Sequence, residues 1–192
     1  MRNSLRLRFL GWAVVALLVW SSARSAPLGE ARTGWSLWGP VSHLGADGAW
    51  LASERARRNG EHERALGLAA WALELDPEST AGWDRLAHYQ ALVLGSPLRE
   101  LDPERRAEWL RAGVATARLG ESSARRPNEL TFLRGMLFQM HAELDPATAW
   151  PGGVPALWRE AADAYTAAEE SGHADAAWML AHAEESARAT SE

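Results

Sequence analysis

The residues of this chain whose types and spacing could support chemistry are histidines and carboxylates, and none completes a catalytic motif. His141-Ala142-Glu143 has the His-x-Glu spacing of zinc deaminases, but those enzymes also need a cysteine pair, and this chain has no cysteine. His173 and His182 are nine residues apart, so they do not share a helix face as metal ligands at positions i and i+4 do. The acidic pairs Glu169-Glu170 and Glu184-Glu185 are typical of solvated helix faces.

Two residue types that many active sites use are missing altogether. The chain contains no cysteine and no lysine, and all 20 of its basic residues are arginine. It therefore has no disulfide, no thiolate ligand or nucleophile, no Schiff-base lysine and no lysine-containing phosphate loop. We expect a protein that is not an enzyme, with no cofactor, no metal and no small-molecule substrate.

The charge distribution separates the N-terminus from the rest of the chain. The formal net charge is −5, yet the first 25 residues hold four arginines and no acidic residue. The remainder carries 16 arginines against 25 acidic residues. Such an acidic body argues against binding of nucleic acid through a basic patch.

Residues 1–26 are typical of an export signal. Three arginines precede the almost wholly apolar run Phe9–Val19, and small residues at 21–25 offer cleavage sites. The run is short for a hydrocarbon core of about 30 Å, so the segment is either a cleaved signal peptide or a retained signal anchor. We favour a transmembrane anchor in the cytoplasmic membrane, with the N-terminus inside and the body outside. Cleavage and secretion is the alternative.

Residues 27–45 are predicted to be a linker or an interfacial segment. The first part is rich in Pro, Gly and small residues. The second part places Trp35, Trp38 and Leu44 close together, before the first predicted helix. This part either lies on the membrane surface or packs under that helix.

Residues 46–192 are predicted to form a single all-α domain, since apolar residues recur at helical spacing and no alternating strand pattern occurs. Asn59-Gly60 and Ser171-Gly172 are stop signals, Asp102-Pro103-Glu104 is a start signal, and Asn128 is a candidate N-cap. The segment 145–155 is a predicted loop. The predicted helices cover about 47–58, 61–75, 79–94, 103–124, 128–144, 155–170 and 174–189.

The stretch 59–87 resembles a tetratricopeptide (TPR) helix pair that runs into a following helix. The alanines of this stretch are small enough to let two antiparallel helices approach closely, and Trp83 fills the space beside them. Pro77 ends one pair before the next begins. The residues that carry the resemblance are Gly60, Ala65, Ala69, Ala72, Leu73, Leu75, Pro77, Trp83 and Leu86.

The later repeats are degenerate. Pro77 and Pro127 are 50 residues apart, whereas the TPR period is about 34 residues. Insertions around 95–108 and 145–155 would account for the difference. The resemblance implies a right-handed α-solenoid of about three degenerate helix pairs, preceded by the apolar N-terminal helix. Helix 174–189 would be its capping helix, with a polar outer face.

Residues 36–170 also resemble a group of bacterial membrane-anchored TPR proteins. Those proteins have a short anchor, a Gly-Pro segment, a Trp-containing helix, a helix pair that ends in Leu-Asp-Pro, and a second Trp helix. The matching residues here are Gly39-Pro40, Ala46-Asp47, Trp50-Leu51, Leu75-Asp76-Pro77 and Trp83. This resemblance implies an architecture and no activity.

In a TPR register the first helix of each pair lines the concave face. A mixed-charge groove of this kind would suit a peptide or a partner helix, although a solvated face is an equal alternative. The residues that the register places there are Glu54, Arg57, Arg58, Asp84, His88, Arg134 and His141.

Three functions follow as hypotheses. The first is a non-enzymatic interaction or scaffold module that binds another protein or peptide at the outer face of the cytoplasmic membrane. The second is a structural subunit of a membrane complex. The third is an envelope or glycan-binding protein that uses exposed tryptophan, for which Trp150 is the candidate, whereas Trp83, Trp158 and Trp178 fall on helix-packing positions.

Overall fold

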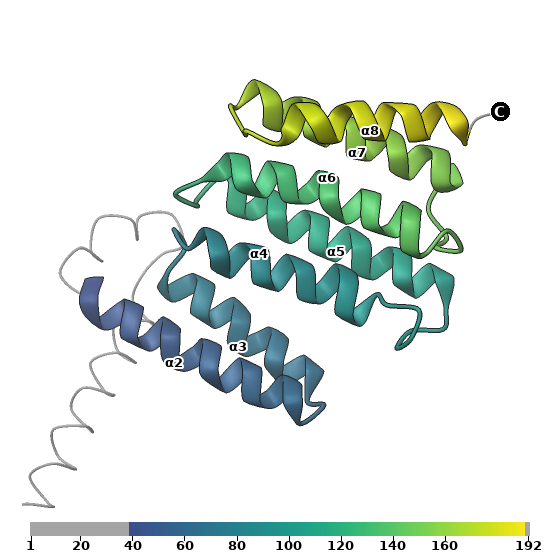
Figure 1. The fold of residues 1–192 in the computed structure, drawn as a ribbon. Coiled ribbons are helices and arrows are strands. Elements are labelled where there is room, and N and C mark those ends of the chain that lie inside the picture. The colour runs from purple at the N-terminus through teal and green to yellow at the C-terminus, as the bar shows by residue number, and fades with distance from the viewer. Residues whose placement is uncertain (1–38, 191–192) are drawn as a thin grey trace, which may run out of the picture. The chain divides into compact units, whose positions relative to one another are not determined.

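The computed structural model describes residues 39–190, and this part of the chain contains helices and no strand (Figure 1). The predicted all-α class is therefore confirmed for these residues. The elements are α2 (Gly39–Arg58), α3 (His62–Leu75), α4 (Thr80–His88), the π-helix η2 (Tyr89–Leu94), α5 (Pro103–Glu121), α6 (Pro127–Leu144), α7 (Gly153–Glu170) and α8 (Ala176–Ala189).

The predicted signal segment 1–26 and most of the predicted linker 27–45 lie outside the described residues. The end of that linker is helical, because α2 begins at Gly39 and not near Asp47. Pro40 permits this earlier start, since a proline in the first helical turn removes no intrahelical hydrogen bond. Among residues 39–190, no helix combines the length and the apolarity that crossing a bilayer requires.

Several helix ends follow from the local signals in the sequence. Gly60 and Gly172 have φ angles of 78° and 82°, which favour glycine, and they end α2 and α7 as predicted. The Asp102 side chain accepts a hydrogen bond of 3.0 Å from the amide of Glu104 at the start of α5. The prediction that Asn128 is the N-cap is wrong, because α6 begins at Pro127 and Arg126 occupies the N-cap position.

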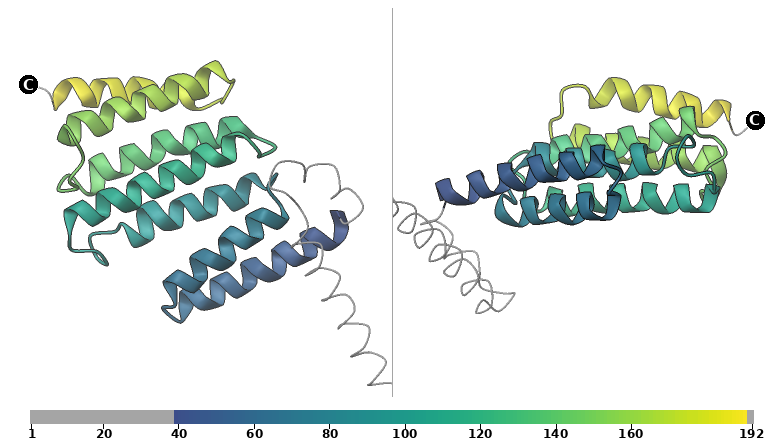
Figure 2. Two further views of the ribbon diagram at one scale, coloured as in Figure 1. Left: turned by 180° about the vertical axis from the view of Figure 1, so that it is seen from behind. Right: turned by 90° about the horizontal axis from the view of Figure 1, so that it is seen from below.

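Successive helices from α4 to α8 pack against one another (Figures 1 and 2). In Figure 1, α4, α6 and α8 lie nearer the viewer, and α5 and α7 lie behind them. Helix α6 is central to this packing, since it contacts α4, α5 and α7. The largest fully buried side chains are Leu110, Leu130, Leu137, Phe138, Leu157 and Tyr165.

Small residues bring α2, α3 and α4 together. Ala65, Ala69 and Ala72 are buried, as the TPR-like pattern predicts, and the Ser53 hydroxyl donates a hydrogen bond of 2.7 Å to the carbonyl of Ala65. Trp83 of α4 is half-buried and packs against the core on both sides of this junction. Helix α4 also contacts α6, and the amide of Arg126 donates to the hydroxyl of Thr80, so the starts of these two helices are neighbours where the candidate site lies.

The third predicted helix, 79–94, changes its winding after His88. Its last six residues, Tyr89–Leu94, form the π-helix η2, in which the amide of Gly95 donates to the carbonyl of Gln90 at 3.1 Å. Within η2 the carbonyl of Ala91 accepts a hydrogen bond of 3.0 Å from Nε2 of His141 in α6. The helical periodicity of the sequence does not distinguish this segment from an ordinary α-helix.

Candidate partner-binding groove

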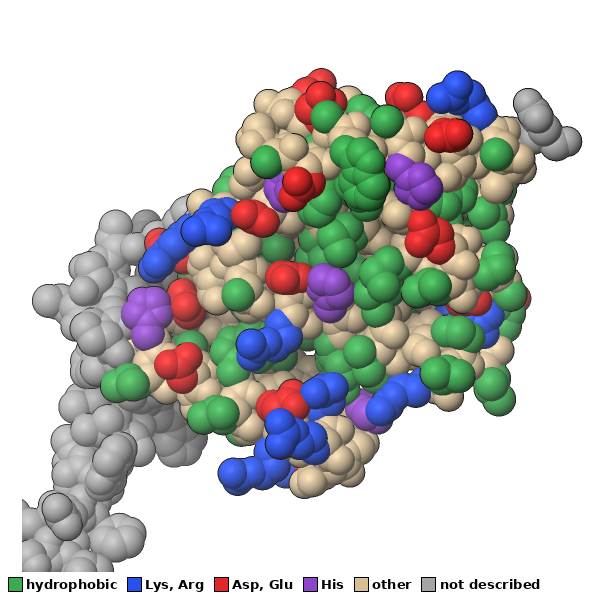
Figure 3. Space-filling model, viewed as in Figure 1, with side chains coloured by type: hydrophobic (Ala, Val, Ile, Leu, Met, Phe, Trp, Pro, Cys, Tyr) green, Lys and Arg blue, Asp and Glu red, His purple; other side chains and the backbone are tan. Residues whose placement is uncertain are grey.

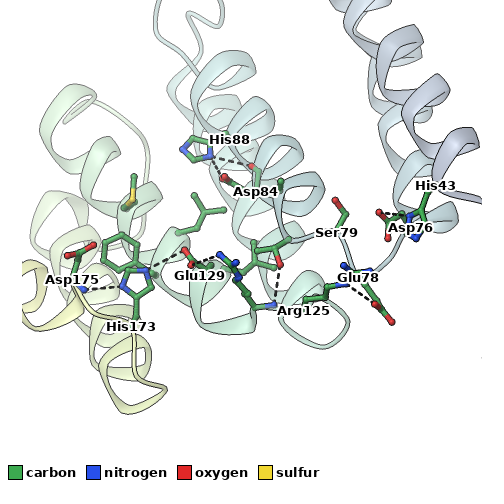
Figure 4. Close-up of a pocket in the computed structure, with 17 residues that line it drawn as sticks. His43, Asp76, Glu78, Ser79, Asp84, His88, Arg125, Glu129, His173 and Asp175 are labelled. Carbon is green, nitrogen blue, oxygen red and sulfur yellow. Dashed lines mark hydrogen bonds and ion pairs between the residues drawn. The ribbon is translucent and has the colours of Figure 1, made fainter. Parts of the chain in front are cut away.

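A groove with a volume of about 780 Å³ crosses the starts of α4 and α6. Its lining comes from α2, from α4 and α6, and from the links that precede α4, α6 and α8, so segments far apart in the sequence meet in it. Figure 3 shows this face, on which acidic and histidine side chains surround apolar ones. Figure 4 shows the lining residues themselves, from His43 at one end to His173 and Asp175 at the other.

The floor of the groove is apolar. Leu130 and Leu133 of α6 are buried in the core beneath it. Phe132 and Met136, from the same helix, are only half-buried and line the groove. These four residues follow the helical spacing predicted for the segment 128–144. The floor therefore offers apolar surface that the fold itself leaves partly uncovered.

The links before α4 and α6 are joined across the groove. Nε of Arg125 donates to Oε2 of Glu78 at 3.0 Å, and the backbone amide of Arg125 donates to the carbonyl of Glu78 at 3.1 Å. The amide of Arg126 donates to the hydroxyl of Thr80 at 3.2 Å. Two backbone donors are thus fixed in this junction, so the relative position of the two helix starts does not depend on the exposed ion pair alone.

Three histidines line the groove, and each lies beside a carboxylate. Nδ1 of His43 is 3.3 Å from Oδ2 of Asp76, and Nδ1 of His88 is 2.5 Å from Oδ1 of Asp84. Nε2 of His173 is 3.6 Å from Oε2 of Glu129. The imidazole of His173 also stacks on the ring of Phe132, with the ring centroids 3.9 Å apart. Aromatic packing and a carboxylate thus hold this histidine against the groove floor.

The hydrogen bond from His88 to Asp84 raises the pKa of His88 above 6.5, and partial burial opposes that shift. The charged form of His88 is therefore favoured by folding. Its stabilising contribution is complete below the unfolded pKa of about 6.5 and is lost as the pH rises through the folded pKa.

We expect Asp84→Asn to lower the pKa of His88, because the carboxylate that favours the imidazolium is gone. Titration of the imidazole resonances by NMR measures this directly. The His43 resonance in the same spectra is the internal control, since its carboxylate partner, Asp76, is unchanged. An unchanged His88 pKa in the variant would contradict the role given to Asp84.

Of the residues predicted for the concave face, Asp84 and His88 line this groove. Glu54, Arg57 and Arg58 do not. They form their own ion cluster on α2, in which Nε of Arg57 and Nε of Arg58 lie 2.8 Å and 3.0 Å from the Glu54 carboxylate. The hydrogen bond from Arg57 is the main cause that lowers the pKa of Glu54 to about 2. The charged groups of these three side chains therefore pair largely with one another.

Arg134 and His141 of α6 also lie outside the groove lining. Nε of Arg134 donates to Oε1 of Glu121 in α5 at 2.6 Å, and its side chain is 14% exposed. His141 is 3% exposed, so the prediction that it lines a binding surface is wrong. It faces η2, and burial lowers its pKa. The repeat register cannot predict this, because η2 supplies the carbonyl that His141 contacts.

The burial of the tryptophans also differs from the prediction. Trp158 is buried as expected, but Trp178 is 72% exposed on α8. The predicted polar outer face of α8 thus contains a large aromatic side chain. Trp150, the predicted exposed tryptophan, is half-buried: its ring packs edge-on against Phe138 and the guanidinium of Arg111 lies 5.2 Å from its centre.

The groove brings carboxylates, histidines and apolar side chains together. Within residues 39–190, no three histidine or acidic side chains lie close enough together to hold a metal ion. Comparisons with protein-family models, with curated protein sequences and with solved structures give no match.

Sequence reasoning missed most of the groove. Most of the residues that it did not single out lie in the links before α4, α6 and α8 or in the first turn of the helix that follows, and they include Glu78, Arg125, Glu129 and Asp175. One signal could have indicated them: in stacked pairs, the links that precede successive first helices lie at one end of the stack. Charged residues in those links are therefore neighbours in space.

Proposed function

We propose that this chain is a non-enzymatic interaction module, built as a TPR-like α-solenoid, that holds a segment of another protein in the groove described above. The observation that carries the proposal is the groove itself, with a partly uncovered apolar floor and a charged rim drawn from three helix pairs. A protein segment suits such a surface, since apolar anchors supply affinity and rim charges supply orientation. Helices α2/α3, α4/α5 and α6/α7 would be the pairs, with α8 as the terminal helix.

The proposal includes a location for the body outside the cytoplasm, and residues 1–26 are its support. An arginine-rich start and a following apolar run support export of the body, with the N-terminal segment as a signal anchor in the cytoplasmic membrane or, alternatively, as a cleaved signal peptide. The groove would then meet its partner outside the cytoplasm. Protease accessibility of the body in intact spheroplasts tests this location.

Ala81 offers a direct test of the groove, because it is exposed, lies in the first turn of α4 and lines the groove. We expect Ala81→Trp to lower capture of the partner by about tenfold or more, since the indole would fill space that the bound segment needs. The measurement is quantitative mass spectrometry of proteins that co-purify with the tagged, detergent-solubilised chain.

Ala70→Trp is the matched control, because Ala70 is exposed on α3 and does not line the groove. Proteins retained by the control and lost from Ala81→Trp are groove ligands. Identical sets of co-purifying proteins from both variants, with unchanged helical circular dichroism, would count against the groove as the binding site.

A structural subunit of a membrane complex is the second candidate. Leu44 and Leu51 of α2 favour it, because they are 72% and 73% exposed and, seven residues apart, they share one face of the helix. A neighbouring subunit would cover them. Extraction in mild detergent that yields the chain alone, as a monomer, would argue against this candidate.

A further inference from the structure

We propose that the segment held in this groove is positively charged, with an apolar side chain flanked by lysine or arginine residues. The inference rests on the proposed function and adds the chemistry of the partner. It is carried by the charge of the rim and by the position of the apolar floor between the rim carboxylates.

The rim carries an excess of negative charge. Five carboxylates and two guanidinium groups line the groove, which leaves a formal charge of −3 when the histidines are neutral. Both guanidinium groups are already engaged: Arg125 pairs with Glu78 at 3.0 Å, and Arg126 lies 3.8 Å from Glu129. The groove therefore offers no unengaged cation to an acidic partner.

The remaining rim carboxylates keep the capacity to accept hydrogen bonds. Asp76 and Asp84 each lie beside a histidine, which uses one of the two carboxylate oxygens. An ionised carboxylate has about four acceptor positions, so each can still receive a guanidinium or an ammonium group. Asp175 lies at the far end of the groove, beside His173 (Figure 4). Acceptors are thus distributed along the groove.

The apolar floor lies between these acceptors. Phe132 and Met136 of α6 line the groove, and the acidic side chains of the rim come from the α3–α4 link, α4, the start of α6 and the α7–α8 link. A segment with an apolar residue between two basic residues would cover the floor and reach carboxylates on both sides. An acidic segment would be repelled at the rim, and a neutral apolar segment would leave the carboxylates beneath it poorly solvated.

Three fluorescein-labelled peptides test the proposal against the full-length protein in a non-ionic detergent. The first repeats Gly-Arg-Leu-Arg, the second replaces arginine by glutamate, and the third replaces leucine by serine. Fluorescence anisotropy gives the dissociation constants at low and moderate salt. We expect the Arg-Leu peptide to bind most tightly, the Arg-Ser peptide more weakly, and the Glu-Leu peptide not measurably.

The decisive comparison uses two variants of equal net charge. Asp84→Asn/Asp175→Asn neutralises two rim carboxylates, whereas Asp47→Asn/Asp163→Asn neutralises two exposed carboxylates outside the groove lining. We expect the rim variant to bind the Arg-Leu peptide about five- to tenfold more weakly than wild type, and the control variant to bind as wild type does.

The outcomes separate this inference from the proposed function. Equal weakening in both variants would attribute binding to the net charge of the chain and would overturn the inference, as would no measurable binding of the Arg-Leu peptide. Tighter binding of the Glu-Leu peptide, abolished by Ala81→Trp, would overturn the inference and leave the groove as a peptide site. Failure of the function itself is different: Ala81→Trp would then change neither peptide binding nor co-purification.

Discussion

Asp145→Ala is expected to lower the free energy of unfolding by about 3–5 kcal/mol, because it leaves the charge of Arg106 buried without a partner. Both residues are 5% exposed. Nε of Arg106 donates to Oδ2 of Asp145 at 2.6 Å, and Nη2 donates to Oδ1 at 3.2 Å. This is a bidentate pair between the first turn of α5 and the C-terminal end of α6.

The pair also organises two links of the chain. Nη1 of Arg106 donates to the carbonyls of Glu100 and Leu101, at 3.2 Å and 3.0 Å, in the segment before α5. The hydroxyl of Thr148, in the link before α7, donates to Oδ2 of Asp145. Removal of the carboxylate therefore leaves the Thr148 hydroxyl without its acceptor and leaves Arg106, which binds the segment before α5, without its counter-ion. Both losses occur in a buried site, which is why the expected loss of stability is large.

Urea unfolding followed by circular dichroism measures the loss. An exposed pair is the matched control: Glu78→Ala removes the partner of Arg125, whose side chain is 67% exposed, and is expected to cost less than about 1 kcal/mol. The double variant Arg106→Met/Asp145→Leu is expected to recover part of the lost stability, since an apolar pair leaves no buried charge but does not replace the hydrogen bonds to Glu100, Leu101 and Thr148. Similar losses from Asp145→Ala and Glu78→Ala would contradict a buried role for the Arg106–Asp145 pair.

Gly113→Ala is the second substitution with a large expected effect. A Cβ atom at position 113 of α5 would lie 2.7 Å from the carbonyl oxygen of Ala87 and 2.8 Å from Cβ of Ala91. The first of these atoms belongs to the backbone, so α5 and α4 would have to move apart. We expect the free energy of unfolding to fall by about 1–3 kcal/mol, the range typical of an overpacked core.

Gly67→Ala is the control, because Gly67 lies within α3 and a Cβ there would meet nothing within 4 Å. This substitution is expected to stabilise the protein by about 0.5–1 kcal/mol through helix propensity alone. The two glycine substitutions should therefore have opposite signs in the same unfolding measurement. A stabilising Gly113→Ala would contradict the close approach of α4 and α5.

The chain contains the triplet Leu-Asp-Pro at 75–77, 101–103 and 144–146, and the three aspartates have different roles that local sequence predicts only in part. Asp76 follows α3 and lies beside His43 in the groove, and Asp102 caps α5. Asp145 follows α6 and is buried against Arg106. The N-cap role of Asp102 is predictable, because the proline and glutamate that follow it are local signals. The buried pair is not, since its partner is 39 residues away.

In the candidate site, too, the sequence predicts some contacts and not others. Asp84 and His88 are four residues apart on one helix, so the repeat register could place both on the groove face. His173 stacks on Phe132 and lies beside Glu129, contacts that depend on how the α7–α8 link returns over α6. The register also misplaced His141, which is buried and donates to the carbonyl of Ala91 in the π-helix Tyr89–Leu94.

By itself the sequence determined that the chain from residue 46 onward is built of helices, although not that α2 begins at Gly39, and it located most helix ends, because periodicity, caps and positive-φ glycines act within a few residues. It also located the closely packed alanines of α3. The tertiary structure alone decided which charges are neighbours and which are buried. Those properties depend on contacts between helices and links that are far apart in the chain, and the sequence pattern carries no information about the distance between two such segments.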